Sequence, residues 1–322
     1  MPISVYVKAD GVASENASPS VSMLPRVRGM GERALVLGGG GSAGNAWLIG
    51  VVAGLFDAGL DVTDADLVIG TSAGSTAAAQ LTGAGPTRSL VDILSAAHQH
   101  RSRPTAAEQP GGRSGPVADH LERTGRIIAS ASDPADMRRR MGAAALELDE
   151  GSDESRLTQW RATVASRVPS QRWPDRLLLI PAVDARTGEP VVFDRHGGVE
   201  LVDAIAASTS SALPWHIGTG RYLDGGYRRN ENADLAAGYE RVLVLSPLGG
   251  RTRHPLEWGM QLAAQVDELR AGGSRVETVL PDSTSLEAFG TNLMDGSTRA
   301  PAARAGHEQG SDLAARLADF WR

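Results

Sequence analysis

The sequence predicts an α/β protein with a mostly parallel central sheet and helices on both of its faces. Three observations support this prediction. Short apolar segments alternate along the chain with segments of helical periodicity, and glycine-rich or acidic turns directly follow several of the apolar segments. The chain has 322 residues, 41% of them hydrophobic, which suffices for a buried core in one large domain or two small ones.

The first predicted strand, residues 34–37, leads into a glycine-rich turn at residues 38–44. The apolar positions that follow have the spacing of one helical face: Leu48, Val51, Val52 and Leu55. Gly59 stands where a C-terminal helix cap is expected. Four consecutive glycines leave backbone N–H groups uncovered by side chains, so that an anion can approach them closely. Ordering four glycines on folding costs much conformational entropy, which suggests that the turn has a function.

Three interpretations of this turn are open from the residues alone. The string Gly39-x-Gly41-x-x-Gly44 fits a dinucleotide-binding fingerprint, which requires an acidic residue at the end of the next strand. The acidic residues at about that distance precede the next strand instead: Asp61, Asp64 and Asp66. The other two interpretations are a turn that binds nothing and an oxyanion hole that faces the end of the neighbouring strand.

The second predicted strand, residues 67–69, leads into Gly70-Thr71-Ser72-Ala73-Gly74 and a helix-forming segment. In this strand–turn–helix context, G-x-S-x-G predicts a nucleophilic serine at Ser72, because the glycines permit a sharp turn that exposes the hydroxyl. The free N–H groups at the start of the helix point to the same place and favour an oxyanion there. Taken alone, the motif also fits a tight turn with a purely structural use.

Residues 86–172 are predicted to form a helical insert or cap between the two halves of the sheet, with a loop at residues 100–117. Asp133 and Pro134 form a helix start signal, as N-cap and first helical residue, and residues 152–154 open a further helix. An insert at this place in the chain can cover an active site as a lid.

The insert is also locally basic. Residues 101–141 hold eight arginines and five acidic residues, in a chain whose net charge is −6. One interpretation is an ordinary solvated helix surface, and the other is a cap that meets anionic lipid head groups. On the second interpretation we expect a helix beside the mouth of the site, with Arg138, Arg139 and Arg140 exposed.

The second half of the chain continues the alternation of strands and helices. A strand at residues 176–183 and a turn at residues 187–190 predict a hairpin with residues 191–193. The further predicted strands are residues 221–224, 241–245 and 275–280, and the further predicted helices are residues 199–207, 256–270 and 311–321.

The strand at residues 221–224 ends in Asp224-Gly225-Gly226, and a small-residue segment at residues 208–215 precedes it. Alone, an Asp-Gly pair is usually only a turn. The ordered set is more specific: a G-x-G-x-x-G turn, a G-x-S-x-G turn about 30 residues later, and D-G-G past the middle of the chain. In this set the chain resembles the patatin-like phospholipase family, over residues 33–85 and 176–250.

The resemblance implies a three-layer patatin-like fold and a serine acyl hydrolase that cleaves carboxylic esters of lipids, of the phospholipase A, lysophospholipase or esterase type. It implies Ser72 as nucleophile and Asp224 as the acid of a dyad without histidine. Gly39, Gly40 and Gly41 match the oxyanion loop, and the remaining motif glycines are Gly44, Gly70, Gly74, Gly225 and Gly226. In one departure, this chain has Ala43 where the family often has Arg or Lys.

The chemistry sets its own conditions. A serine hydroxyl needs a base, and a carboxylate with an ordinary pKa of about 3.9 is a weak one unless burial raises that pKa. We therefore expect Ser72 and Asp224 to lie within roughly 2.6–3.2 Å of one another. A triad with His254 also fits the chain order of α/β-hydrolases, although its polar loop suggests a solvated residue. His216 is a candidate to line a pocket.

Composition narrows the class of protein. The net charge of −6 argues against general nucleic-acid binding, and the absence of cysteine excludes disulfides and thiol chemistry. No metal-ligand pattern is present, and we expect no cofactor. Residues 1–30 suggest a disordered extension rather than a signal peptide or membrane span, ahead of a single domain at residues 31–322.

The sequence thus predicts a cytoplasmic enzyme whose partner is a lipid or small ester, with transient contact to a membrane surface. Two alternatives stand beside it: a dinucleotide-binding α/β protein, and a patatin-like fold kept as a non-catalytic interaction module. The first differs in what the glycine loop faces, and the second in whether Ser72 reacts.

Overall fold

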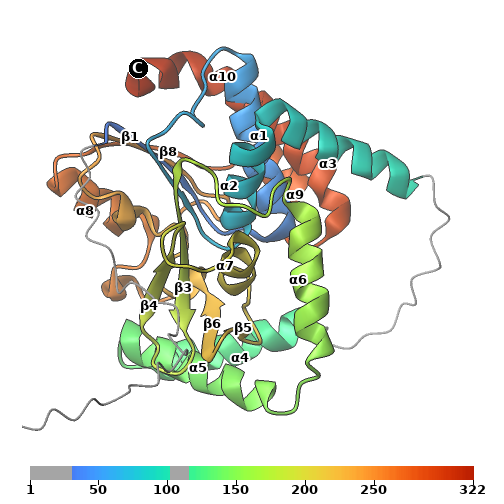
Figure 1. Cartoon of the computed structure of the whole chain (residues 1–322). Coiled ribbons are helices and arrows are strands. Elements are labelled where there is room, and N and C mark those ends of the chain that lie inside the picture. Colours follow the sequence, from blue (N-terminus) through green and yellow to red (C-terminus); the bar gives the residue numbers. More distant parts are fainter. Residues whose placement is uncertain (1–30, 102–115) are drawn as a thin grey trace, which may run out of the picture.

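The computed structural model describes residues 31–101 and 116–322, and these form an α/β fold around one sheet (Figure 1). The strands are β1 (Arg33–Leu37), β2 (Leu67–Gly70), β3 (Leu177–Asp184), β4 (Pro190–Phe193), β5 (Trp215–Ile217), β6 (Gly220–Asp224), β7 (Arg241–Leu245) and β8 (Arg275–Val279). Their order in the sheet is β5-β6-β3-β2-β1-β7-β8, with β4 paired to β3 outside this path.

The centre of the sheet is parallel, as the sequence predicts. Strand β1 pairs in parallel with β2 and β7, while β3 joins β2 and β8 joins β7 in the same direction. Leu37 stands opposite both Gly70 and Leu245, so these three strands end level with one another. Strands β4, β5 and β6 are antiparallel. The carboxyl ends of β1 and β2 therefore present their following turns at one edge.

Helices cover both faces of the sheet. The α-helices are α1 (Gly41–Asp57), α2 (Ala73–Ala84), α3 (Pro86–Arg101), α4 (Pro116–Ser130), α5 (Pro134–Asp149), α6 (Ser155–Arg167), α7 (Leu201–Ser208), α8 (Leu262–Ala271), α9 (Ser283–Phe289) and α10 (Arg299–Trp321). Short 3-10 turns are η1 (Gly225–Tyr227), η2 (Ala233–Ala236), η3 (Leu256–Trp258) and η4 (Gly296–Thr298).

Side-chain alternation along the strands divides the core into two layers. In β1, Leu35 and Leu37 pack on the face covered by α1, α2, α7 and α10, while Ala34 and Val36 pack on the face covered by α8 and η2. In Figure 1, α8 lies to the left of the sheet and α1 and α3 to its right. Both faces of the central strands are thus removed from water, as expected for a parallel sheet.

A third apolar cluster positions the helices of the middle segment. It joins Ile128 of α4 and Met137 of α5 to Val183 of β3 and Leu223 of β6. Figure 1 shows α4 and α5 below the ends of the antiparallel strands. Helix α3 contributes instead to the core beside α1, through Leu90 and Ile93. The described parts of residues 86–172 therefore pack in two places rather than as one separate body.

Two helix boundaries follow the predicted signals. Helix α1 ends at Asp57, and Gly59 adopts φ 87° while Leu60 N–H donates to Leu55 O at 2.8 Å. Helix α5 begins at Pro134, and the carboxylate of Asp133 accepts from the N–H of Asp136 at 2.8 Å. The predicted hairpin of β3 and β4 is also present.

Other predicted boundaries are wrong. The single helix expected at residues 256–270 is divided into η3 and α8, because Gly259 at φ 62° ends the first turn. The last helix starts at Arg299 rather than at residue 311. Glycines at positions 306 and 310 interrupt its apolar pattern in the sequence, yet they lie at a helix contact. Strand β5, which has only three residues, is too short for its alternation to be read.

Several expectations fall outside what is described or are corrected. The extension predicted at residues 1–30 and most of the loop predicted at residues 100–117 lie outside the described residues. Arg138 is half-buried rather than exposed, because its Nε donates to Gly188 O at 2.7 Å, and burial lowers its pKa. Within the described chain, no helix is both long and apolar enough to span a bilayer.

Candidate active site

Ser72 occupies a sharp turn between β2 and α2. Its backbone lies at φ 52° and ψ −119°, in a region that a residue with a side chain rarely adopts, so the turn is strained. Close packing maintains it: a Cβ at Gly74 would lie 2.0 Å from the carbonyl oxygen of Leu37, so only glycine lets α2 approach the end of β1. The strand–turn–helix context expected of a nucleophile elbow is therefore present.

The hydroxyl of Ser72 meets the carboxylate of Asp224, which ends β6. Ser72 Oγ donates to Asp224 Oδ2 at 2.7 Å, within the distance expected from the sequence. The second carboxylate oxygen, Oδ1, accepts from the N–H of Gly226 at 2.8 Å, which fixes the orientation of the group. Residues far apart in the chain are thus brought into one hydrogen-bonded pair.

The small-residue segment ahead of β6 supports both partners. The hydroxyl of Ser208, at the end of α7, accepts from the N–H of Ser72 at 3.0 Å. The carbonyl of Ser210 accepts from the N–H of Asp224 at 2.9 Å. Ser208 is fully buried and Ser210 nearly so. This segment therefore hydrogen bonds to both members of the pair.

The environment of Asp224 makes it a stronger base than a solvated carboxylate. Burial raises the pKa of Asp224 from 3.8 to about 6, although the hydrogen bonds from Gly226 and Ser72 act in the opposite direction. Burial also raises the pKa of the neighbouring Tyr227, and the charge of Asp224 adds to that effect. Tyr227 therefore stays neutral, and its hydroxyl donates to the carbonyl of Ser211.

The glycine turn between β1 and α1 faces Ser72. A Cβ at Gly39 would lie 3.5 Å from the Cβ of Ser72. The N–H of Gly39 itself is taken by the carbonyl of Asn230 at 3.1 Å. By contrast, the N–H groups of Gly40 and Gly41, and that of Ala73 in the elbow, have no acceptor among the residues the structure describes. Such free amides are expected in the first turn of a helix.

Two polar residues beside the turn escaped the sequence analysis. Asn230 donates through Nδ2 to Glu231 Oε1 at 2.9 Å, and its side chain lies against Gly39. Glu231 is only 1% exposed and also accepts from Ser246 Oγ at 2.7 Å and Gln265 Nε2 at 3.2 Å. The available signal was their place shortly after Asp224-Gly225-Gly226, where polar residues precede the next buried strand.

The histidine alternative finds no support in the geometry. Among the described residues, no histidine hydrogen bonds to Asp224. His254 Nδ1 instead lies 2.8 Å from Thr252 Oγ1, and its ring stacks on Trp258. His254 is half-buried rather than solvated as expected, and this burial lowers its pKa to about 4. Nε2 of His216, in β5, lies 2.7 Å from Oδ2 of Asp149, the last residue of α5.

The acidic residues weighed for a dinucleotide site lie at the opposite end of β2. The carboxylate of Asp66 accepts from the N–H groups of Glu32 and Arg33, at 2.8 Å and 3.0 Å, and Asp64 pairs with Arg33 at 3.0 Å. They hold the start of the sheet together and do not approach the glycine turn. Within residues 31–101 and 116–322, no group of three acidic or histidine side chains could hold a metal ion.

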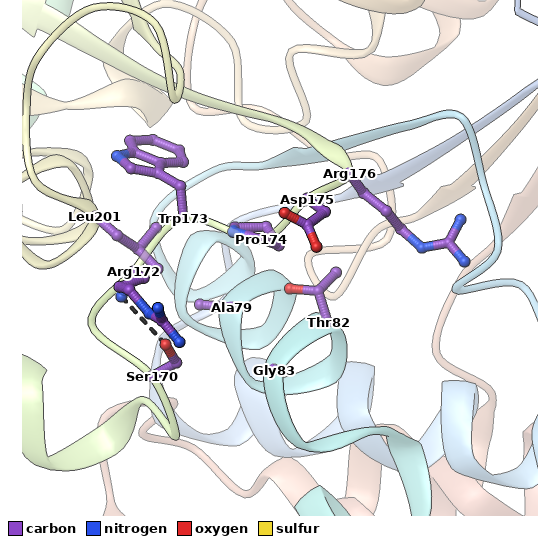
Figure 2. Close-up of a pocket in the computed structure, with 10 residues that line it drawn as sticks. All are labelled: Ala79, Thr82, Gly83, Ser170, Arg172, Trp173, Pro174, Asp175, Arg176 and Leu201. Atoms are coloured by element: carbon purple, nitrogen blue, oxygen red, sulfur yellow. Dashed lines mark hydrogen bonds between the residues drawn. The ribbon is translucent and has the colours of Figure 1, made fainter.

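A cavity of about 680 Å³ lies away from Ser72. Figure 2 shows Thr82, near the carboxyl end of α2, below Asp175 of the segment that leads into β3, with the ring of Trp173 pointing away from both. Ser72 lies before the first residue of the same helix. The dimensions of this cavity therefore say nothing about the substrate of the Ser72 site.

The chain matches one protein family by sequence and is similar to several solved structures. A family model described as patatin-like phospholipase matches residues 35–237. No curated protein matches the chain by sequence. Among solved structures, VipD from Legionella pneumophila is 12% identical with a TM-score of 0.41, over 89% of this chain and 67% of that one. The type III effector protein ExoU is 15% identical with a TM-score of 0.37, over 88% of this chain and 53% of that one. The chain thus spans only about half the length of ExoU.

Proposed function

Because the chain belongs to the patatin-like phospholipase family, we propose that it is a lipid acyl hydrolase whose catalytic groups are Ser72 and Asp224. The observation that carries this proposal is the 2.7 Å hydrogen bond from the strained Ser72 to a carboxylate that burial makes more basic. A dyad of this kind uses one carboxylate as the base in both halves of the reaction.

In the first half, Ser72 Oγ attacks the carbonyl carbon of an ester while its proton passes to Asp224 Oδ2. The carbonyl oxygen becomes an oxyanion. The free N–H groups of Gly40, Gly41 and Ala73 are the donors we assign to it, whereas the N–H of Gly39 keeps its bond to Asn230 and shapes the loop. The intermediate then collapses: the ester C–O bond breaks, and the alcohol leaves with the proton from Asp224.

In the second half, the acyl group is bound to Ser72 and Asp224 is again a carboxylate. It accepts a proton from water, whose oxygen attacks the acyl carbon and forms a second oxyanion at the same donors. The acyl–serine bond breaks, Ser72 recovers its proton from Asp224, and a carboxylic acid leaves. These steps use only groups of this chain together with water.

The family is the basis for proposing lipid esters as the substrate class. We propose in addition that the protein contacts lipid surfaces. Arg139 and Arg140 are the exposed arginines of α5, but each pairs with Asp136, at 3.7 Å and 2.9 Å. Asp136 offsets part of their charge, so attraction to an anionic bilayer is weak and salt-sensitive.

We further propose a cytoplasmic enzyme with one domain at residues 31–322, in which residues 86–172 are an insert and α4 lies beside the site.

The test is a panel of phospholipids, lysophospholipids and short-chain esters, assayed with the wild type and with Ser72→Ala. The proposal requires hydrolysis of at least one ester class by the wild type and none by Ser72→Ala, with unchanged circular dichroism. Equal inactivity of both proteins on every ester would instead favour a non-catalytic interaction module.

A further inference from the structure

Residues 38–44, which form the glycine turn, include no charged side chain, and position 43 is a fully buried alanine. A cation nevertheless reaches the turn from the other end of the chain. We infer that Arg299, the first residue of α10, positions the glycine turn and supplies the positive charge that Ala43 cannot. This inference rests on the proposed function, since it concerns stabilisation of the oxyanion formed at Ser72.

The contacts of Arg299 span the first turn of α1. Its Nη1 donates to the carbonyl of Ser42 at 3.1 Å, and its Nη2 donates to Asn45 Oδ1 at 2.9 Å. Ser42 and Asn45 lie on either side of Ala43 in the sequence. One planar guanidinium therefore donates hydrogen bonds to two residues of this turn. A single ammonium group could not make both bonds with the same geometry.

A second set of hydrogen bonds connects Arg299, through Asn45, to the nucleophile elbow. The other side-chain atom of Asn45, Nδ2, donates to the carbonyl of Ala73 at 3.3 Å and to Gln80 Oε1 at 3.1 Å. Ala73 follows Ser72 directly and carries one of the amides that we assign to the oxyanion. Two hydrogen bonds thus connect Arg299 to the elbow. They join the starts of α1 and α2, which are the places where all the assigned donors lie.

The electrostatics of Arg299 favour a role with an anion. No carboxylate in the described part of the chain pairs with it. Burial lowers the pKa of Arg299 to about 10, with repulsion from Arg167 as a smaller cause, so the guanidinium stays charged at neutral pH. A cation at the N-terminal end of a helix opposes the helix dipole, and a desolvated one costs free energy. An oxyanion that forms at the same turn would offset both costs.

The packing of α10 on α1 holds Arg299 in place. Each helix contributes a pair of glycines, Gly50 and Gly54 in α1 and Gly306 and Gly310 in α10. A Cβ at Gly50 would lie 2.2 Å from Ala303 O, and one at Gly306 would lie 2.5 Å from Trp47 O, so backbone meets backbone. The matched family region ends at residue 237, and α10 lies beyond it. A segment outside that region thus supports the oxyanion turn.

The experiment compares Arg299→Lys, which keeps the charge, with Arg299→Met, which keeps the apolar stem but removes the charge. Arg304→Met, an exposed position on the same helix, is the matched control. We expect Arg299→Met to lower kcat at least about tenfold with KM within about twofold, a smaller loss than the roughly 10²–10³-fold cost of removing an oxyanion donor itself. Arg299→Lys should recover much of this loss, and Arg304→Met should match the wild type. Equal kcat for wild type and Arg299→Met would overturn the inference.

Hydrogen exchange separates this inference from the proposed function. Arg299→Met should speed exchange of the hydrogen-bonded amides of Ala43 and Gly44, which donate to Leu293 O and Gly40 O, whereas Arg304→Met should leave this exchange unchanged. If the wild type hydrolyses no ester, the proposed function fails and this readout alone decides whether Arg299 orders the turn. Unchanged exchange in Arg299→Met would refute the positioning role. Equal kcat losses in Arg299→Lys and Arg299→Met would refute the role of its charge.

Discussion

Replacement of Asp224 by asparagine should lower kcat strongly and, above about pH 6, make the protein more stable. The side chain keeps its shape, and its amide oxygen can still accept from the N–H of Gly226. It can no longer accept a proton from Ser72. Since general-base catalysis contributes roughly 10²–10⁴-fold, kcat should fall by about that factor while KM changes little.

The stability change follows from the raised pKa. A carboxyl with a pKa of 3.8 when exposed and about 6 in the fold binds its proton more tightly in the folded state. Ionisation of Asp224 therefore destabilises the fold as pH rises from about 4 to about 6, and the effect is complete above that range. A shift of about two pKa units corresponds to roughly 3 kcal/mol. The Asp224→Asn variant, whose amide does not ionise, would avoid this cost.

Urea unfolding of wild type and Asp224→Asn across pH 4 to 8 measures this cost directly. The difference in unfolding free energy should be near zero at about pH 4 and approach roughly 3 kcal/mol in favour of Asp224→Asn at pH 7. In parallel, kcat/KM of the wild type should fall as pH drops through about 6, because Asp224 takes up its proton. A pH-independent stability difference would refute the claim that burial sets the pKa of Asp224.

Three further predictions test the surroundings of the dyad. His254→Ala should leave kcat/KM within about twofold of the wild type, because His254 does not reach Asp224, and a loss as large as that of Asp224→Asn would restore the triad. Glu231→Gln should lower the unfolding free energy by roughly 1–3 kcal/mol in urea, since one donor would lose its buried acceptor. Gly50→Ala should lower it by roughly 1–3 kcal/mol, because its Cβ would lie 2.2 Å from Ala303 O; unchanged urea midpoints would contradict these two predictions.

Local patterns predicted the parts of the fold that local physics determines. The central strands are continuous apolar runs, and the caps at Gly59 and Asp133 depend on residues within one helical turn. The elbow at Ser72 was also recognisable, because its glycines are required by backbone packing. Each of these features can be read from a window of a few residues.

The features that could not be predicted from the sequence depend on contacts between segments far apart in the chain. The start of α10 is hidden because its glycines serve a helix pair rather than an apolar stripe. Arg138 was expected in solvent, yet the turn at Gly188 accepts its hydrogen bond. The network of Asn230, Glu231 and Arg299 joins segments far apart in the chain, and no single stretch of sequence carries a signal for it.

The central claim is that Ser72 is a nucleophile activated by its environment. The most direct measurement is intact-protein mass spectrometry after incubation with a fluorophosphonate, for the wild type, Ser72→Ala and the control Ser75→Ala, whose buried hydroxyl only donates to Ser72 O. We predict one covalent adduct on the wild type and on Ser75→Ala, located by peptide mapping at Ser72, and no adduct on Ser72→Ala. A wild type that remains unlabelled, or a Ser72→Ala variant labelled as fully as the wild type, would contradict the account.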